Sequence, residues 1–229
     1  MRNPSQKEQV YIRFFHATPQ QAPVDVYVNG TLIHSGLSYR QSTAYIPLVR
    51  GVYDIRIVDA NTGHTLLIQR LTVSDHQYIT IIAIAETNRV GLLSLPDKGM
   101  KALTLQENDP SPYSYPPIYT EYVTNLTRKE DIGSLVPVRF VHLSPNAPEL
   151  DLYLDGNAIH RDLIYKEATA YMGIMPRQYR LVLRAFRTGR EVAVIDPLTI
   201  SEWKAQTVYI TGLLGGAPRL EAVVLTDGE

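Results

Sequence analysis

Residues 24–34 read VDVYVNGTLIH and residues 150–160 read LDLYLDGNAIH, so the same phrase occurs in both halves of the chain. Before each turn, apolar and polar residues alternate with the period of a β-strand that has one buried face. The dipeptides Asn29-Gly30 and Asp155-Gly156 follow, and such pairs accept the positive φ angles of a tight hairpin turn. Each phrase therefore predicts a β-hairpin with its valines or leucines on the buried face and its aspartate and tyrosine on the other.

A constant shift that carries residue 24 onto residue 150 aligns the two halves. Units of this length are domains, because the repeats of a solenoid run to about 20–50 residues. We expect an N-terminal tail at 1–9, a first repeat at 10–97, a linker at 98–136 and a second repeat at 137–229. The matched pairs include Arg13 with Arg139, His16 with His142, Asp25 with Asp151, Gly30 with Gly156 and Tyr45 with Tyr171.

Further β-rich runs separated by short turns follow each hairpin. In the first half these runs cover residues 43–48, 53–58, 65–73, 78–85 and 90–95. About seven short strands with a turn roughly every 8–12 residues are typical of a β-sandwich, and no helical pattern of convincing length occurs. The sequence predicts an all-β protein made of two tandem antiparallel β-sandwich domains.

Composition excludes several classes of function. The 22 lysines and arginines balance 23 acidic residues, so no overall field favours nucleic acid or an anionic membrane. The chain has no cysteine, which excludes disulfides, thiolate metal sites and cysteine nucleophiles. No secretion signal is visible in the opening MRNPSQKEQV, and the longest apolar run is far too short to span a bilayer. The compartment stays open between cytoplasmic synthesis with deposition in a spore coat and a cell-surface protein that lacks its leader.

The segment between the repeats is rich in proline and tyrosine, and residues 110–122 read PSPYSYPPIYTEY. Its prolines favour an extended polyproline conformation and exclude central strands. The preferred interpretation is a linker or arm that packs its rings on a sandwich, with a partner-docking segment or a tyrosine cross-linking site as alternatives. Its candidate contact residues are Tyr113, Tyr115, Tyr119 and Tyr122.

Residues 138–156, VRFVHLSPNAPELDLYLDG, resemble the opening motif of the bacterial domain-of-unknown-function family DUF4397, and residues 12–30 are a weaker copy of that motif. The resemblance covers both halves and leaves out the linker. It implies immunoglobulin-like or transthyretin-like sandwiches, which often occur in tandem in bacterial envelope and surface proteins. It implies no activity and no catalytic residue.

Histidine and aspartate recur within this motif. His16 and His142 stand at a strand end before a Thr-Pro or Ser-Pro step, where an imidazole can donate to a loop carbonyl and fix the turn. The alternative pairs His16 with Asp25, or His142 with Asp151, to orient the ring for a metal or for base catalysis. A zinc site would need His16, His34 and Asp25 to converge. We prefer the structural interpretation, in which the aspartates are solvent-side or edge-strand charges paired across strands with Arg13 or Arg139, and we assign no metal ligand.

A second group of candidates lies in the second half. Arg180 and Arg184 share a strand face with Val182 within an arginine-rich stretch. A solvated sheet face is the preferred interpretation, and a site for an anionic polymer or phosphate is the alternative. Trp203, the only tryptophan, either stacks on a sugar ring or lies buried against the linker.

The sequence favours a protein without a cofactor or a catalytic centre. The leading hypothesis is a structural or adhesive bacterial protein of the envelope, surface or spore layers, which contacts other proteins or itself through exposed edge strands. A carbohydrate- or polymer-binding module is the alternative, and a metal-dependent enzyme centred on His16 and His142 is the weaker one. Neither nucleic acid nor a membrane is an expected partner.

Overall fold

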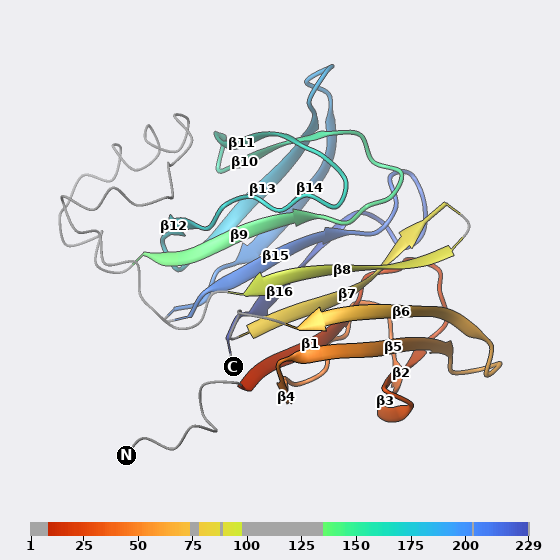
Figure 1. The fold of residues 1–229 in the computed structure, drawn as a ribbon. Coiled ribbons are helices and arrows are strands. Elements are labelled where there is room, and N and C mark those ends of the chain that lie inside the picture. Colours follow the sequence, from red (N-terminus) through yellow and green to blue (C-terminus); the bar gives the residue numbers. More distant parts are fainter. Residues whose placement is uncertain (1–8, 74–77, 88, 98–134, 203, 229) are drawn as a thin grey trace, which may run out of the picture. The chain divides into compact units, whose positions relative to one another are not determined.

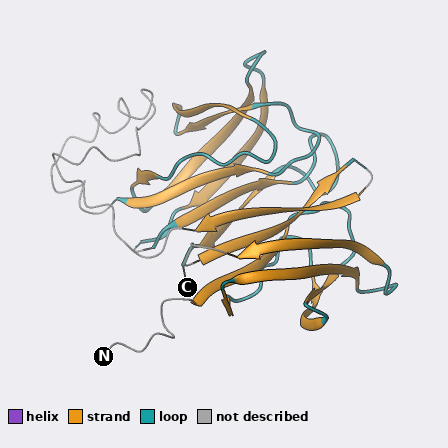
Figure 2. Ribbon diagram, in the orientation of Figure 1, coloured by secondary structure: helices purple, strands orange, loops and turns teal. Residues whose placement is uncertain are grey.

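The computed structural model describes residues 9–73, 78–87, 89–97, 135–202 and 204–228. Figure 2 shows strands joined by loops, and these residues contain no helix, hence none that is long and apolar enough to cross a membrane. The strands fall into two compact units, β1–β8 and β9–β16 (Figure 1). The prediction of two tandem β-sandwiches is confirmed. The predicted linker lies outside the described residues except for residues 135 and 136.

The first sandwich consists of two four-stranded sheets with the orders β4-β1-β7-β8 and β3-β2-β5-β6. The chain passes from one sheet to the other after β1, β3, β4 and β6, so both sheets draw on the whole length of the unit. The strands are β1 (Gln9–His16), β2 (Val24–Val28), β3 (Thr31–Leu37), β4 (Ile46–Val49), β5 (Gly51–Asp59), β6 (Thr65–Val73), β7 (Tyr78–Glu86) and β8 (Arg89–Asp97).

The second sandwich repeats this arrangement strand for strand, with the sheet orders β12-β9-β15-β16 and β11-β10-β13-β14. Equal strand orders in the two units are what a duplicated sequence predicts. The strands are β9 (Val136–His142), β10 (Leu150–Leu154), β11 (Asn157–Leu163), β12 (Met172–Ile174), β13 (Gln178–Ala185), β14 (Glu191–Thr199), β15 (Gln206–Thr211) and β16 (Glu221–Thr226).

The alternation in the sequence decides which side chains fill each core. On β2, the three valines are buried, whereas the intervening Asp25 and Tyr27 are partly exposed. The turn that follows takes φ values of 48° at Asn29 and 80° at Gly30, as the predicted hairpin requires. Each valine or leucine buried in this way contributes roughly 1.5–3 kcal/mol to folding, so the alternation fixes the face that each strand turns inward.

One strand pair in each sandwich is parallel, so the prediction of antiparallel sandwiches is wrong for that pair. β1 pairs in parallel with β7, and β9 pairs in parallel with β15. All four strands lie inside their sheets and are largely buried along their length. Strands buried on both faces read as near-continuous apolar runs, and such runs suit the interior position that parallel pairing needs.

Each sandwich also buries a polar cluster, which in the first unit starts from Arg13. Its Nε donates to Thr80 Oγ1 over 2.7 Å, and the Thr80 hydroxyl donates to Asp97 Oδ2 over 2.5 Å. Tyr45 donates to the same carboxylate oxygen over 2.7 Å, and the Arg13 guanidinium lies 4.8 Å from the centre of the Tyr45 ring. Burial raises the pKa of the Tyr45 hydroxyl above its ordinary value, so this hydroxyl stays protonated and donates.

The second sandwich builds the same cluster from Arg139, Thr207, Asp227 and Tyr171. Arg139 donates to Thr207 over 2.9 Å, Thr207 donates to Asp227 over 2.6 Å, and Tyr171 donates to Asp227 over 2.7 Å. The arginine again lies 4.8 Å from the tyrosine ring centre. A polar cluster that recurs with the same geometry in both units is a fixed part of this fold, because a buried charge needs its full set of partners.

Replacing Asp97 by alanine should lower the free energy of unfolding of the first unit by about 3–5 kcal/mol, because Arg13 would stay buried without the carboxylate 4.0 Å away. Asp54→Ala is the matched control, since Asp54 forms an exposed pair with Arg70 and its loss should cost less than about 1 kcal/mol. Urea unfolding followed by circular dichroism measures both values. Equal losses in the two variants would contradict the role given to the cluster.

Candidate functional site

A fully buried histidine organises the loop that follows the first strand of each unit. His16 ends β1 and His142 ends β9, and both are 0 % exposed. Nε2 of His16 donates to the Ala22 carbonyl over 3.3 Å, and Nδ1 accepts from the Thr18 N–H over 3.2 Å. His142 makes the same two bonds within its own loop, over 3.1 and 3.2 Å. Each imidazole therefore joins the beginning of its loop to the end.

These two bonds fix the protonation state of the ring. A carbonyl oxygen can only accept, so Nε2 carries the hydrogen, and a backbone N–H can only donate, so Nδ1 keeps its lone pair. Burial lowers the pKa of His16 and of His142, and the bond to the carbonyl opposes this shift only in part. As predicted, each imidazole donates a hydrogen bond to a loop carbonyl. The other ring nitrogen accepts a hydrogen bond, so both nitrogens that could bind a metal or transfer a proton are already engaged.

The expected pairs of Asp25 with Arg13 and of Asp151 with Arg139 do not form, and neither do the alternative pairs of these aspartates with His16 and His142. The two arginines lie on β1 and β9, in the opposite sheet from the aspartates, so the expected cross-strand pairs cannot form. Asp151 is also only 2 % exposed, so its expected solvent-side position is wrong, and the expected edge-strand position is wrong for both aspartates because β2 and β10 are interior strands. Each aspartate instead holds the irregular stretch of the neighbouring edge strand. The donors are the Ser35 hydroxyl and Gly36 N–H for Asp25, and the Arg161 guanidinium and Asp162 N–H for Asp151.

The candidate zinc ligands of the first half do not converge. His34 lies on β3, whereas His16 lies on β1 in the other sheet and turns into its own loop. Within the described ranges, no three histidine or carboxylate side chains gather closely enough to hold a metal ion. The weaker hypothesis of a metal-dependent enzyme therefore gains no support from the position of these side chains.

The arginines of the second half have partners on their own surface. The Arg180 guanidinium lies 3.8 Å from Asp196, and Arg184 lies 4.6 Å from the centre of the Tyr153 ring. Two further arginines of this stretch pair with acids, Arg177 with Asp155 and Arg187 with Glu149. Because three of these four arginines pair with nearby acids and the fourth lies over an aromatic ring, the arrangement suits a solvated sheet face better than an anion-binding site.

A row of four side chains crosses the outer face of the sheet β3-β2-β5-β6. The strand register places Leu32 beside Tyr27, Tyr27 beside Arg56, and Arg56 beside Ile68. The Arg56 guanidinium lies 4.1 Å from the centre of the Tyr27 ring, while Leu32 is 48 % and Ile68 is 66 % exposed. We call these four residues the tyrosine row. The register of the second unit gives the corresponding row Ala158, Tyr153, Val182 and Val194.

Several predicted residues lie outside the described part of the chain, namely Trp203, Tyr113, Tyr115, Tyr119 and Tyr122. Sequence reasoning in turn missed Leu32, Arg56 and Ile68. Counting outward from the predicted hairpin turn would have placed Leu32 beside Tyr27, but the positions of Arg56 and Ile68 depend on strand pairings between distant segments. The glycine-rich stretch GLLGGAP, residues 212–218, is the kind of sequence that indicates a turn, and in the structure it belongs to a longer loop that lines a pocket.

Stability of the first sandwich should fall as the pH drops below about 6.5, the ordinary pKa of histidine. The unfolded chain takes up a proton on His16 more readily than the folded chain does. The contribution of His16 to the free energy of unfolding is therefore fully present above this pH and is lost as the pH falls toward the lower pKa of the folded state. The slope is at most about 1.4 kcal/mol per pH unit for each such group. Urea unfolding between pH 8 and 5 should show a steeper loss for the wild type than for His16→Gln.

His64→Gln is the control, because it removes a histidine from an exposed turn and leaves the buried ring in place. It should keep the wild-type slope. If the stability of His16→Gln had the same pH dependence as that of the wild type, the neutral buried imidazole of His16 would be ruled out as the source of that pH dependence.

Two solved structures match the chain weakly. The C-terminal domain of AlgF from P. aeruginosa is 18% identical, with coverage of 41% of this chain and 98% of that one and a TM-score of 0.28. CBMbc, of family CBM26, from Eubacterium rectale Amy13K, solved in complex with maltoheptaose, is 8% identical over 95% of this chain and 96% of that one, with a TM-score of 0.26. At such TM-scores neither structure supports an inference about function.

No curated protein matches the chain. One family model does match, over residues 10–105 and 136–229, so that one matched stretch falls on each sandwich. The family is described as a domain of unknown function and brings no activity with it. The chain therefore belongs to the family DUF4397, of which it carries two tandem copies.

Proposed function

We propose that this protein is a non-catalytic structural or adhesive protein that acts through protein–protein contacts, and that it associates with further copies of itself. The observation that carries the proposal is the tyrosine row, which ends at the free edge of β6. Tyrosine and arginine are enriched at the centres of protein interfaces, because tyrosine covers a large area with few rotatable bonds and arginine donates several hydrogen bonds from one planar group. Here the pair is flanked on each side by an exposed aliphatic residue, Leu32 and Ile68.

The edge strand β6 supports this proposal. It pairs only with β5 among the described strands, so its outer backbone donors and acceptors face away from the sheet. Proteins usually protect such an edge with proline, a bulge or inward-pointing charges. β6 has a register irregularity near its start, between Thr65 and Leu67, but it contains no proline and a single charged residue, Arg70, which already pairs with Asp54. A nine-residue edge with Ile68 next to its central residue suits strand addition from a second copy.

The same surface gives less support to the alternative of a carbohydrate-binding module. A sugar ring stacks on the open face of an aromatic side chain. In the first unit Arg56 lies over Tyr27 at 4.1 Å, and in the second unit Arg184 and Arg161 lie over Tyr153 at 4.6 and 5.4 Å. Binding a sugar there would require these cation–π contacts to open first.

The setting that we propose is the envelope, surface or spore layers of a bacterium. It rests on the resemblance of both halves to domains that often occur in tandem in bacterial envelope and surface proteins. A chain without cysteine suits such a layer, because its two cores need no disulfides.

Ile68→Lys should abolish self-association, because a charge in the middle of the edge strand opposes pairing with a second copy. Sedimentation velocity over a series of concentrations should show the wild type moving to larger species while the variant stays monomeric. The substitution is exposed, so the free energy of unfolding should change by no more than about 0.5 kcal/mol.

Asn61→Lys adds the same charge in the exposed turn between β5 and β6 and should associate like the wild type. A wild-type chain that stays monomeric throughout would overturn the proposal. Thermal stabilisation of that monomer by a soluble glycan would favour the carbohydrate-binding alternative instead.

A further inference from the structure

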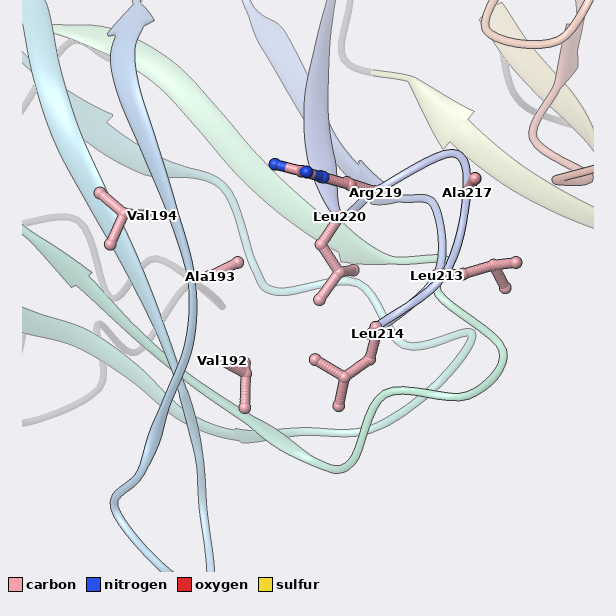
Figure 3. Close-up of a pocket in the computed structure, with 10 residues that line it drawn as sticks. Val192, Ala193, Val194, Leu213, Leu214, Ala217, Arg219 and Leu220 are labelled. Carbon is pink, nitrogen blue, oxygen red and sulfur yellow. The ribbon is translucent and has the colours of Figure 1, made fainter.

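The second sandwich has a pocket of about 650 Å³ between the edge strand β14 and the loop at residues 212–220 that joins β15 to β16. This volume lies within the usual range of roughly 300–1,000 Å³ for ligand pockets. Figure 3 shows the side chains of Leu214 and Leu220 between the loop and β14, where Ala193 and Val194 lie. Leu220 and Ala193 also pack against the core, so the floor of the pocket is continuous with it.

The loop is held in shape by hydrogen bonds from Asn146 and by the close approach of its two ends. The Asn146 side-chain amide donates to the Leu214 carbonyl over 3.1 Å and accepts from the Leu214 N–H over 2.9 Å. At the base of the loop, Gly212 has a φ of +96°, and a Cβ there would stand 2.0 Å from the Arg219 carbonyl oxygen. Only glycine allows this closure, so the pocket wall is preorganised.

This loop belongs to the second sandwich alone. In the first sandwich, the equivalent strands β7 and β8 are joined directly from Glu86 to Arg89. The position equivalent to Asn146 is Gln20. The pocket therefore arises where the two copies diverge, and the shared scaffold does not require it.

Two features of the pocket indicate what it binds. Arg219 is exposed at its mouth, and Figure 3 shows its guanidinium reaching from the loop toward β14. In the described part of the chain this guanidinium has no acidic partner. The other wall is the outer edge of β14, which pairs only with β13 among the described strands and so presents free backbone groups beside Val192 and Val194.

We propose that this pocket binds an extended peptide strand that pairs with the outer edge of β14. One apolar side chain of the peptide lies against Leu214 and Leu220, and one acidic side chain of the peptide binds the guanidinium of Arg219. The peptide site is separate from the tyrosine row and does not depend on self-association.

A peptide satisfies this pocket better than a simple apolar anion does. An alkyl chain with an acidic head would contact the leucines and Arg219, but it would cover the backbone groups of β14 without bonding to them. Each such group left unpaired on burial costs about 1–3 kcal/mol. A peptide strand supplies alternating donors and acceptors to that edge, together with apolar side chains and a carboxylate.

Isothermal titration calorimetry on the full chain tests the proposal. The probe is an acetylated and amidated hexapeptide of alternating threonine and valine with one glutamate, compared with the same peptide carrying lysine at that position. Arg219→Glu should weaken binding of the glutamate peptide by about tenfold or more, because a charge-assisted hydrogen bond is lost and a like charge is introduced. The same variant should bind the lysine peptide more tightly than the wild type does.

Arg190→Glu, a charge reversal at the exposed turn between β13 and β14, is the matched control and should bind both peptides like the wild type. Methylation of alternate backbone nitrogens of the peptide should abolish binding, since it blocks strand pairing. The proposal would be overturned if octanoate bound as tightly as the glutamate peptide. It would also be overturned if Arg219→Glu did not change which of the two peptides, glutamate or lysine, binds more tightly. Repeating the titration in the Ile68→Lys chain separates a failure of this site from a failure of self-association.

Discussion

A neutral imidazole, buried at the end of the first strand of each sandwich, is the interaction on which the rest of each unit depends. Its two nitrogens bond to the two ends of one short loop, and that loop carries the chain from one sheet to the other. The position of β2 follows from this loop, and with it the outward direction of Asp25 and Tyr27. In the second unit the same loop also presents Asn146, which bonds to the wall of the pocket. A shift in the imidazole would therefore reach both the sheet surface and the pocket.

The parts of the fold that are local in sequence could be predicted from it. Alternation and an Asn-Gly or Asp-Gly turn define a hairpin within about ten residues, and the structure has that hairpin in both halves. The bond from His16 to the Ala22 carbonyl also spans only six residues, so a hydrogen bond from this histidine to the loop that follows it could be predicted. Local geometry leaves few alternatives for such contacts.

The partners of Arg13 could not be found in this way. They depend on β7 lying beside β1, a parallel pairing between segments at opposite ends of the unit, and no local pattern reports which strands become neighbours. The constant shift that revealed the duplication also fails near the end of each half, because the β15–β16 loop is longer than its counterpart. Asp97 and Asp227 consequently do not align, and the last member of each buried cluster escaped notice. The pocket was missed for a related reason, since a glycine-rich stretch indicates a turn but not what the turn encloses.

The two copies share one scaffold but differ at equivalent edges, and this difference separates the two roles that we infer. β6 offers nine residues without proline, and Ile68 is 66 % exposed. β14 contains Pro197, which has no backbone N–H to donate to an added strand. Val194, which occupies on β14 the position that Ile68 has on β6, is only 37 % exposed. The part of β14 that precedes Asp196 is also the part that the loop carrying Arg219 faces. A nine-residue edge without proline suits pairing with an identical chain, whereas an edge of equal length that proline interrupts, beside a preorganised pocket, selects one peptide by its side chains. The first sandwich is therefore suited to assembly and the second to recognition.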